Sequence, residues 1–101
     1  MSKYGLCGKF STAPENRDTL VDILSKAADL MKTAEGCQAY IVYCDVDDAG
    51  GVWVTEIWDS EEAHDQSLKI HGVADLIAKA RPIITGVPVS GKLTPVHGVG
   101  L

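Results

Sequence analysis

Two neighbouring segments of this sequence have the composition of β-strands and are apolar on both of their alternating faces. The segments are Gln38–Val46 and Val52–Trp58, where β-branched and aromatic residues are frequent. In the second segment, Glu56 is the one charged side chain. A sheet with one face in water alternates apolar with polar residues, so strands of this kind need cover on both faces. The fold must therefore supply a layer on each side of these two strands.

The periodicity of the flanking segments predicts a strand, a helix and a last extended segment. Alternation predicts a first strand over Lys3–Ser11 and a final extended segment over Gly86–His97, whose prolines favour an edge position. Apolar residues at steps of three and four predict a helix that begins with a Thr12–Glu15 capping box and ends at Gly36.

The junction over Val52–His71 runs from a strand into a second helix and collects most of the reactive side chains. This helix is expected to begin after Ser60, to break near Gly72 and to end at Pro82. Asp59 and Ser60 can each cap it, and Asp59 with Glu62 has the pattern of a capping box.

The resulting order is β-α-β-β-α-β, an α+β ferredoxin-like fold with an antiparallel sheet, in one domain over residues 1–101. Helices on one face leave the other face bare and apolar. We therefore predict a homodimer in which two sheets pack face to face and the C-terminal strand reaches toward the partner.

The net charge of −5 disfavours nucleic acids and anionic membranes as partners. No apolar run approaches the about 18 residues of a membrane span. The first ten residues lack the apolar core of a signal peptide, so a cytoplasmic location is expected.

Glu56 is a carboxylate in an apolar strand, and such a group either finds partners or has its pKa raised by burial. It is interpreted as a pocket acid or base, or as a residue bonded at the dimer interface to Lys9, Lys92 or Arg81. Trp58 lies on the same strand face and can stack on an aromatic ligand or pack in the core.

His64 and His71 carry imidazoles that titrate near neutral pH, so either can serve as a general base. Their separation of seven residues is two helical turns, which places both on one face if the helix is continuous. The alternative for His71 is a surface position.

The spacing of the two histidines is too long for both to bind one metal ion, and the acidic linker Asp45–Gly51 lacks the spacing of a calcium loop. No metal is therefore predicted.

The three cysteines, Cys7, Cys37 and Cys44, show neither C-x-x-C spacing nor a nearby His pair. They are interpreted mainly as small buried hydrophobes. Cys7 has the alternative of a reactive pocket residue, because Gly5 and Gly8 leave room beside the first strand.

The sequence resembles the antibiotic biosynthesis monooxygenase family in its order of elements, in the motif Glu56-x-Trp58-Asp59-Ser60-x-Glu62-Ala63 and in His71 on the following helix. The resemblance extends from Tyr4 to His97. It implies a dimeric α+β barrel with a small cavity between sheet and helices. In that cavity O₂ oxidises a small aromatic, quinol- or polyketide-like substrate without a metal or an organic cofactor. An electron-rich aromatic can itself reduce O₂ once it is deprotonated, so the protein supplies a dry pocket and a proton acceptor.

The resemblance places Trp58 and His71 at family positions. Together with the residue-by-residue interpretation, it predicts His71 and His64 as catalytic residues, and Trp58, Glu56, Tyr43 and Cys7 as substrate-binding residues. The alternative function is a non-catalytic dimeric domain that binds a hydrophobic small molecule. An open cavity with ionisable groups pointing inward would favour catalysis over this alternative.

Some positions depart from the family pattern. Ser67 stands where family members often carry a His and where the haem-degrading branch has a Trp, and residues 6–9 lack the Asn of that branch. Haem oxidation is therefore disfavoured. Val54 and His64 stand nearest to the positions where the phenol-oxidising branch tends to have Asn and Tyr.

Overall fold

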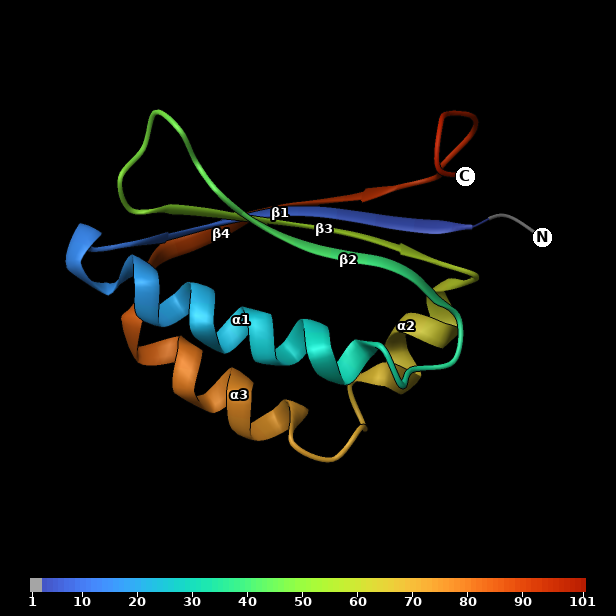
Figure 1. The fold of residues 1–101 in the computed structure, drawn as a ribbon, viewed down its shortest axis with the longest axis horizontal. Coiled ribbons are helices and arrows are strands. Elements are labelled where there is room, and N and C mark those ends of the chain that lie inside the picture. Colours follow the sequence, from blue (N-terminus) through green and yellow to red (C-terminus); the bar gives the residue numbers. More distant parts are fainter. Residues whose placement is uncertain (1–2) are drawn as a thin grey trace.

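In the computed structural model, which describes residues 3–101, the chain forms a four-stranded antiparallel sheet with the strand order β2-β3-β1-β4. The strands are β1 (Tyr4–Thr12), β2 (Cys37–Cys44), β3 (Gly51–Trp58) and β4 (Ile84–Leu93). The helices are α1 (Arg17–Met31), α2 (Glu61–Ser67) and α3 (Val73–Ala80), with 3₁₀ turns at Pro14–Asn16 and Arg81–Ile83. All three helices lie on one side of the sheet (Figure 1). The predicted α+β ferredoxin-like order is confirmed.

The register of the strands decides which side chains face the helices. Tyr4 pairs with Trp58, and Phe10 pairs with Val52, so these residues lie on one face. We call this side the covered face, because it packs against the helices. Successive residues of a strand point to opposite faces. The other side, the open face, carries Cys7, Lys9, Ile41, Tyr43, Trp53, Thr55, Ile57, Val89 and Leu93.

Two clusters of buried side chains form the core between the covered face and the helices. One contains Leu20, Ile23, Val52 and Ala80, and the other contains Met31, Trp58 and Val73. The buried residues of α1 recur at the predicted steps of three and four, because one stripe of this helix faces the sheet. Trp58 is completely buried and anchors the second cluster.

The start of α1 differs from the sequence-based prediction. Thr12 is the last residue of β1, where its backbone N–H and its Oγ1 both donate to the Gly50 carbonyl at 2.8 and 3.2 Å. Thr12 is therefore not a helix cap. A Cβ at position 50 would collide with the Thr12 carbonyl, so a glycine is required there. The helix begins at Arg17, after a 3₁₀ turn that accommodates Pro14.

The second predicted helix is two helices. Ser60, and not Asp59, caps α2, since its Oγ accepts a hydrogen bond from the Ala63 N–H at 3.1 Å. The predicted Asp59–Glu62 capping box is wrong. After α2 ends, the chain turns over residues 68–72, and Gly72 adopts a left-handed φ of 96° before α3 begins. The helix is therefore not continuous from His64 to His71, so the two imidazoles do not share one helix face.

The two edges of the sheet are β2 and β4. Pro88 lies in β4, so the predicted edge position of this strand is confirmed. This strand begins and ends earlier than predicted, at Ile84 and Leu93, and the C-terminal segment then leaves the sheet on the side away from the helices (Figure 1). No helix among residues 3–101 combines the length and the apolar character that crossing a membrane requires.

Candidate active site

A cavity of about 160 Å³ lies on the covered face of the sheet, with walls from all four strands. Phe10 on one wall packs against the first core cluster, and Tyr40 on another packs against the second. The remaining lining residues are Gly8, Val54, Glu56, Pro88, Val89 and Ser90. The wall is mostly apolar, with the polar groups of Tyr40, Glu56 and Ser90 as the exceptions.

Glu56 is the carboxylate of this cavity. Its Oε1 accepts a hydrogen bond from Trp58 Nε1 at 3.0 Å, from a side chain two residues along the same face of β3. Burial raises the pKa of Glu56, while the Trp58 hydrogen bond and the nearby His64 oppose that rise. A carboxyl group with a raised pKa is suited to accept and return a proton near neutral pH.

Among residues 3–101 of the single chain, none of the three cations considered as partners of Glu56 forms a salt bridge with it. Lys9 instead contacts Asp45 and Asp48, at 3.4 and 3.0 Å, and Lys92 contacts Glu61 at 3.3 Å. Arg81 is exposed and forms no salt bridge within the described part of the chain. Glu56 is thus held within its own subunit by Trp58.

Tyr40 lies beside Glu56 and was not singled out from the sequence. The two residues are direct partners in the β2–β3 register. Burial, together with the neighbouring Glu56, raises the pKa of Tyr40 well above its ordinary value, so its hydroxyl stays neutral and can donate a hydrogen bond. The pairing could have been found by counting outward from a hairpin loop centred on residue 48, because this loop fixes the register of both strands.

His64 contacts the same group from α2 without lining the cavity. Its ring lies 5.7 Å from the Trp58 ring in an edge-on arrangement and 5.6 Å from the Tyr4 ring. Its Nδ1 is 3.0 Å from Asp65 Oδ1. His64 therefore packs against the residue that hydrogen-bonds Glu56.

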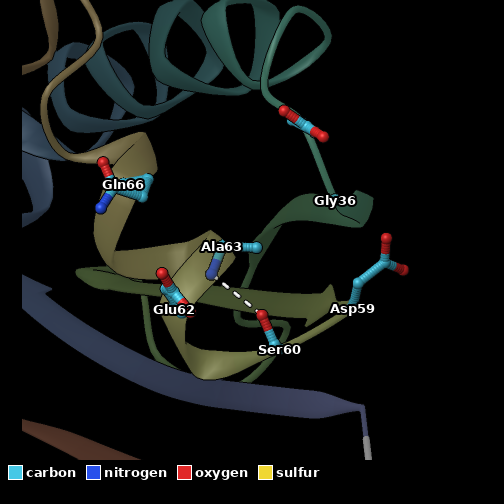
Figure 2. Close-up of a pocket in the computed structure, with 7 residues that line it drawn as sticks. Gly36, Asp59, Ser60, Glu62, Ala63 and Gln66 are labelled. Carbon is cyan, nitrogen blue, oxygen red and sulfur yellow. Dashed lines mark hydrogen bonds between the residues drawn. The ribbon is translucent and has the colours of Figure 1, made fainter. Parts of the chain in front are cut away.

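A larger, shallow groove of about 320 Å³ lies where α2 begins beside the turn before β2 (Figure 2). It is lined by Glu35, Gly36, Asp59, Ser60, Glu62, Ala63 and Gln66. Its three carboxylate residues are exposed, and the Ser60–Ala63 hydrogen bond in Figure 2 is the cap of α2. Within residues 3–101, no group of three or more His, Cys, Asp or Glu residues is arranged to bind a metal. The carboxylates of this groove are exposed, whereas Glu56 in the cavity on the covered face is half-buried.

Comparison with known proteins identifies the family. The family profile described as antibiotic biosynthesis monooxygenase matches residues 4–78. A structure from Chloroflexus aurantiacus J-10-fl, a candidate antibiotic biosynthesis monooxygenase, is 40% identical over 96% of both chains, with a TM-score of 0.87. The chain belongs to the antibiotic biosynthesis monooxygenase family. No protein with a curated function matches the sequence.

Two solved structures with lower sequence identity share the fold. Rv0793 from Mycobacterium tuberculosis is 20% identical over 97% of this chain and 99% of its own, with a TM-score of 0.85. SnoaB from Streptomyces nogalater, described as a cofactor-independent oxygenase, is 14% identical over 98% of both chains, with a TM-score of 0.81. At these identities the likeness concerns the fold alone.

The structure brings together only part of the site-residue set predicted from the sequence. Trp58, Glu56 and His64 lie in one contiguous group on the covered face and α2. Tyr43 is on the open face, with its hydroxyl 2.8 Å from Thr55 Oγ1, and Cys7 is paired with Thr55 on that same face. His71 is exposed in the turn between α2 and α3.

Proposed function

We propose that this protein is a monooxygenase that oxidises a small phenol or quinol with O₂ in the cavity at Glu56. The observation that carries the proposal is a half-buried carboxylate with a raised pKa, placed beside a neutral tyrosine in a mostly apolar cavity. Membership of the monooxygenase family supports the reaction class. The cofactor-independent activity named for SnoaB gives a precedent on the same fold.

In this proposal Glu56 accepts a proton from a hydroxyl of the substrate. The resulting phenolate passes electrons to O₂ and forms a carbon–oxygen bond, and Glu56 returns its proton to the peroxide, which gives a hydroperoxide on the ring. Glu56 then removes the hydrogen from that ring carbon and passes this proton to the departing hydroxide as the O–O bond breaks. Water leaves, and the ring carbon becomes a carbonyl. A quinol supplies all four electrons that O₂ requires, so quinol and O₂ give a hydroxyquinone and water without another reductant.

Three side chains assist Glu56. Trp58 Nε1–H orients the carboxylate. His64 packs against Trp58 and, when protonated, lowers the pKa of Glu56. Tyr40 remains a hydrogen-bond donor throughout the neutral pH range and can stabilise the phenolate oxygen. His71, Tyr43 and Cys7 have no role in this mechanism, because they lie outside the cavity.

The functional unit in this proposal is a homodimer. Ile41, Val89 and Leu93 of the open face are 47%, 66% and 55% exposed in the single chain. Exposed apolar side chains on one face of a sheet favour an interaction site there. A second copy packed face to face would provide the second layer that β2 and β3 require.

The test is oxygen uptake by purified protein with 1,4-dihydroxybenzene, 1,4-dihydroxynaphthalene and anthrone, corrected for oxidation without protein. We expect uptake with at least one of them, and a loss of roughly 10²- to 10⁴-fold in Glu56→Gln, the usual contribution of a general base. The exposed Glu15→Gln is the matched control and should retain full activity. A loss in His71→Ala as large as in Glu56→Gln would contradict the assignment of the base. Binding of these compounds without any oxygen uptake would favour the non-catalytic binding domain instead.

A further inference from the structure

We infer that Gly8 makes the cavity selective for a single aromatic ring that carries a polar group at each end. The inference rests on the proposed function for the identity of the ligand as a phenol or quinol. It goes further by naming the residue that sets the size of the ligand and a second polar contact, at Ser90.

Gly8 is the floor of the cavity. In the sheet register it lies between Val54 of β3 and Ser90 of β4, in a row of residues on the covered face. A side chain at this position would rise from the covered face into the cavity. A Cβ built on Gly8 would meet only the Val89 carbonyl, at an ordinary contact distance of 3.4 Å. The absence of a side chain at Gly8 therefore creates the space, and a flat ring can approach the backbone there.

The volume fits one ring. The cavity measures about 160 Å³. A protein cavity of about 150 Å³ with an apolar lining holds one benzene molecule, whereas pockets for drug-sized ligands start at about 300 Å³. Phe10 bounds the space on one side and Tyr40 on another, and both also pack in the core, which limits their movement. Two or three fused rings exceed this space.

The polar groups lie on both sides of Gly8. Glu56 and Tyr40 come from β3 and β2, while Ser90 comes from β4, on the far side of β1. The strands of Glu56 and Ser90 are two apart, which is roughly 10 Å at the usual spacing between strands. The Ser90 hydroxyl makes no hydrogen bond among the residues that the structure describes, although it borders the cavity. A ring over Gly8 with oxygen atoms at opposite positions would reach Glu56 with one and Ser90 with the other.

Binding under anaerobic conditions tests this inference separately from catalysis. Tryptophan fluorescence of the intact protein would be titrated with 1,4-dihydroxybenzene, phenol and 1,4-dihydroxynaphthalene. We expect the single-ring diol to bind at least ten-fold more tightly than the fused-ring diol. Ser90→Ala should weaken binding of the diol about three- to ten-fold and leave binding of phenol unchanged, the effect of one hydrogen bond.

The decisive variants fill the floor of the cavity. Gly8→Leu should abolish binding of the single-ring diol, and Gly8→Ala should weaken it. The control is Gly91→Ala in β4, where a Cβ would meet no atom closer than 3.9 Å. If Gly8→Leu does not fold, Gly8→Ala carries the test, since its Cβ fits without strain. Equal binding of the fused-ring diol, or unchanged binding in the Gly8 variants, would overturn the inference. Tight binding without oxygen uptake would instead remove the proposed catalysis and leave the size selection standing.

Discussion

Glu56 and Trp58 stand two residues apart on β3, and this spacing explains how a carboxylate is held on the covered face. Side chains at i and i+2 share one side of a strand, so the Trp58 indole can donate directly to the Glu56 carboxylate. The indole supplies one hydrogen bond but no charge. The carboxylate is therefore satisfied in part and remains costly to ionise, as its raised pKa shows. The site gains a proton acceptor at some cost in stability.

Replacing Glu56 by Gln should stabilise the protein at neutral and alkaline pH. A raised pKa means that the folded state holds the Glu56 proton more tightly than the unfolded state. The stabilisation from this proton is complete below the unfolded pKa and is lost as the pH rises through the folded pKa. Gln does not ionise, and its amide oxygen can still accept from Trp58. Thermal unfolding should show no difference at pH 4 and a higher Tm for Glu56→Gln at pH 8. A lower Tm at pH 8 would show that ionised Glu56 stabilises the fold.

The sequence predicted Glu56 as a candidate acid or base, but it predicted only some of the residues around Glu56 in the cavity. A carboxylate within an apolar strand, followed two residues later by Trp58, predicted a shared face. Tyr40 was missed because its role depends on pairing between β2 and β3, and no local pattern distinguishes it from Tyr43. His71 has the residue type of a general base, yet a turn of the chain leaves it in solvent.

At the scale of elements, the β2–β3 hairpin is fixed by a network around Asp45. One Asp45 oxygen accepts from Trp53 Nε1 at 2.8 Å, and the other accepts from the backbone N–H of Asp47 at 2.9 Å. The Trp53 hydrogen bond, followed by the Asp47 N–H and then Lys9, lowers the pKa of Asp45 to about 2. Arg17 Nη1 closes the network by donating to the carbonyls of Asp45 and Asp48. The network holds the loop that sets the register of Tyr40 and Glu56.

Asp45→Asn should destabilise the protein at pH 7 and have little effect near pH 2. A lowered folded pKa gives stability that is present above the unfolded value, ordinarily 3.8, and is lost as the pH falls through about 2. Urea unfolding at pH 7, 4 and 2.5 would follow the difference between wild type and variant. Asp22→Asn, at an exposed position of α1, is the control and should change nothing. A constant difference at all three pH values would show that Asp45 acts by shape alone.

The elements themselves were predicted better than their ends. Alternation and the three-four periodicity identified the strands and the apolar stripe of α1, because burial against one neighbour imposes these patterns. The ends depend on distant groups. Thr12 continues β1 because Gly50, 38 residues away, offers a carbonyl, and Gly72 separates α2 from α3 through its left-handed backbone. The residues around Thr12 do not indicate its hydrogen bonds to the Gly50 carbonyl, so the local sequence could not predict this end of β1.

For the whole molecule, the main consequence of the fold is that one broad face of the sheet has no cover. The helices and their core clusters lie on the other side (Figure 1). Ile41 and Tyr43 on this open face are 47% and 41% exposed in the single chain. Apolar surface of this extent stabilises association when a matching surface is available, and a second copy provides one.

Ile41→Glu should convert the proposed homodimer into a monomer at micromolar concentration. The substitution places a charge on the β2 side of the open face, and the charge would lose its water in the dimer without gaining a partner. Light scattering coupled to size-exclusion chromatography measures the mass directly. Val46→Glu, in the exposed loop after β2, should remain dimeric. A wild-type protein that is monomeric under the same conditions would contradict the proposed dimer.

The claim on which the proposed chemistry depends is that the ligand enters the cavity at Gly8 and Glu56, and not the acidic groove where α2 begins. Amide and indole NMR shifts, recorded anaerobically while 1,4-dihydroxybenzene is added, test this most directly. We predict the largest changes at Gly8, Tyr40 and Glu56 and at the Trp58 indole N–H, which donates to the Glu56 carboxylate. Changes centred on Gly36, Ser60 and Ala63, with the Trp58 indole signal unmoved, would contradict the account.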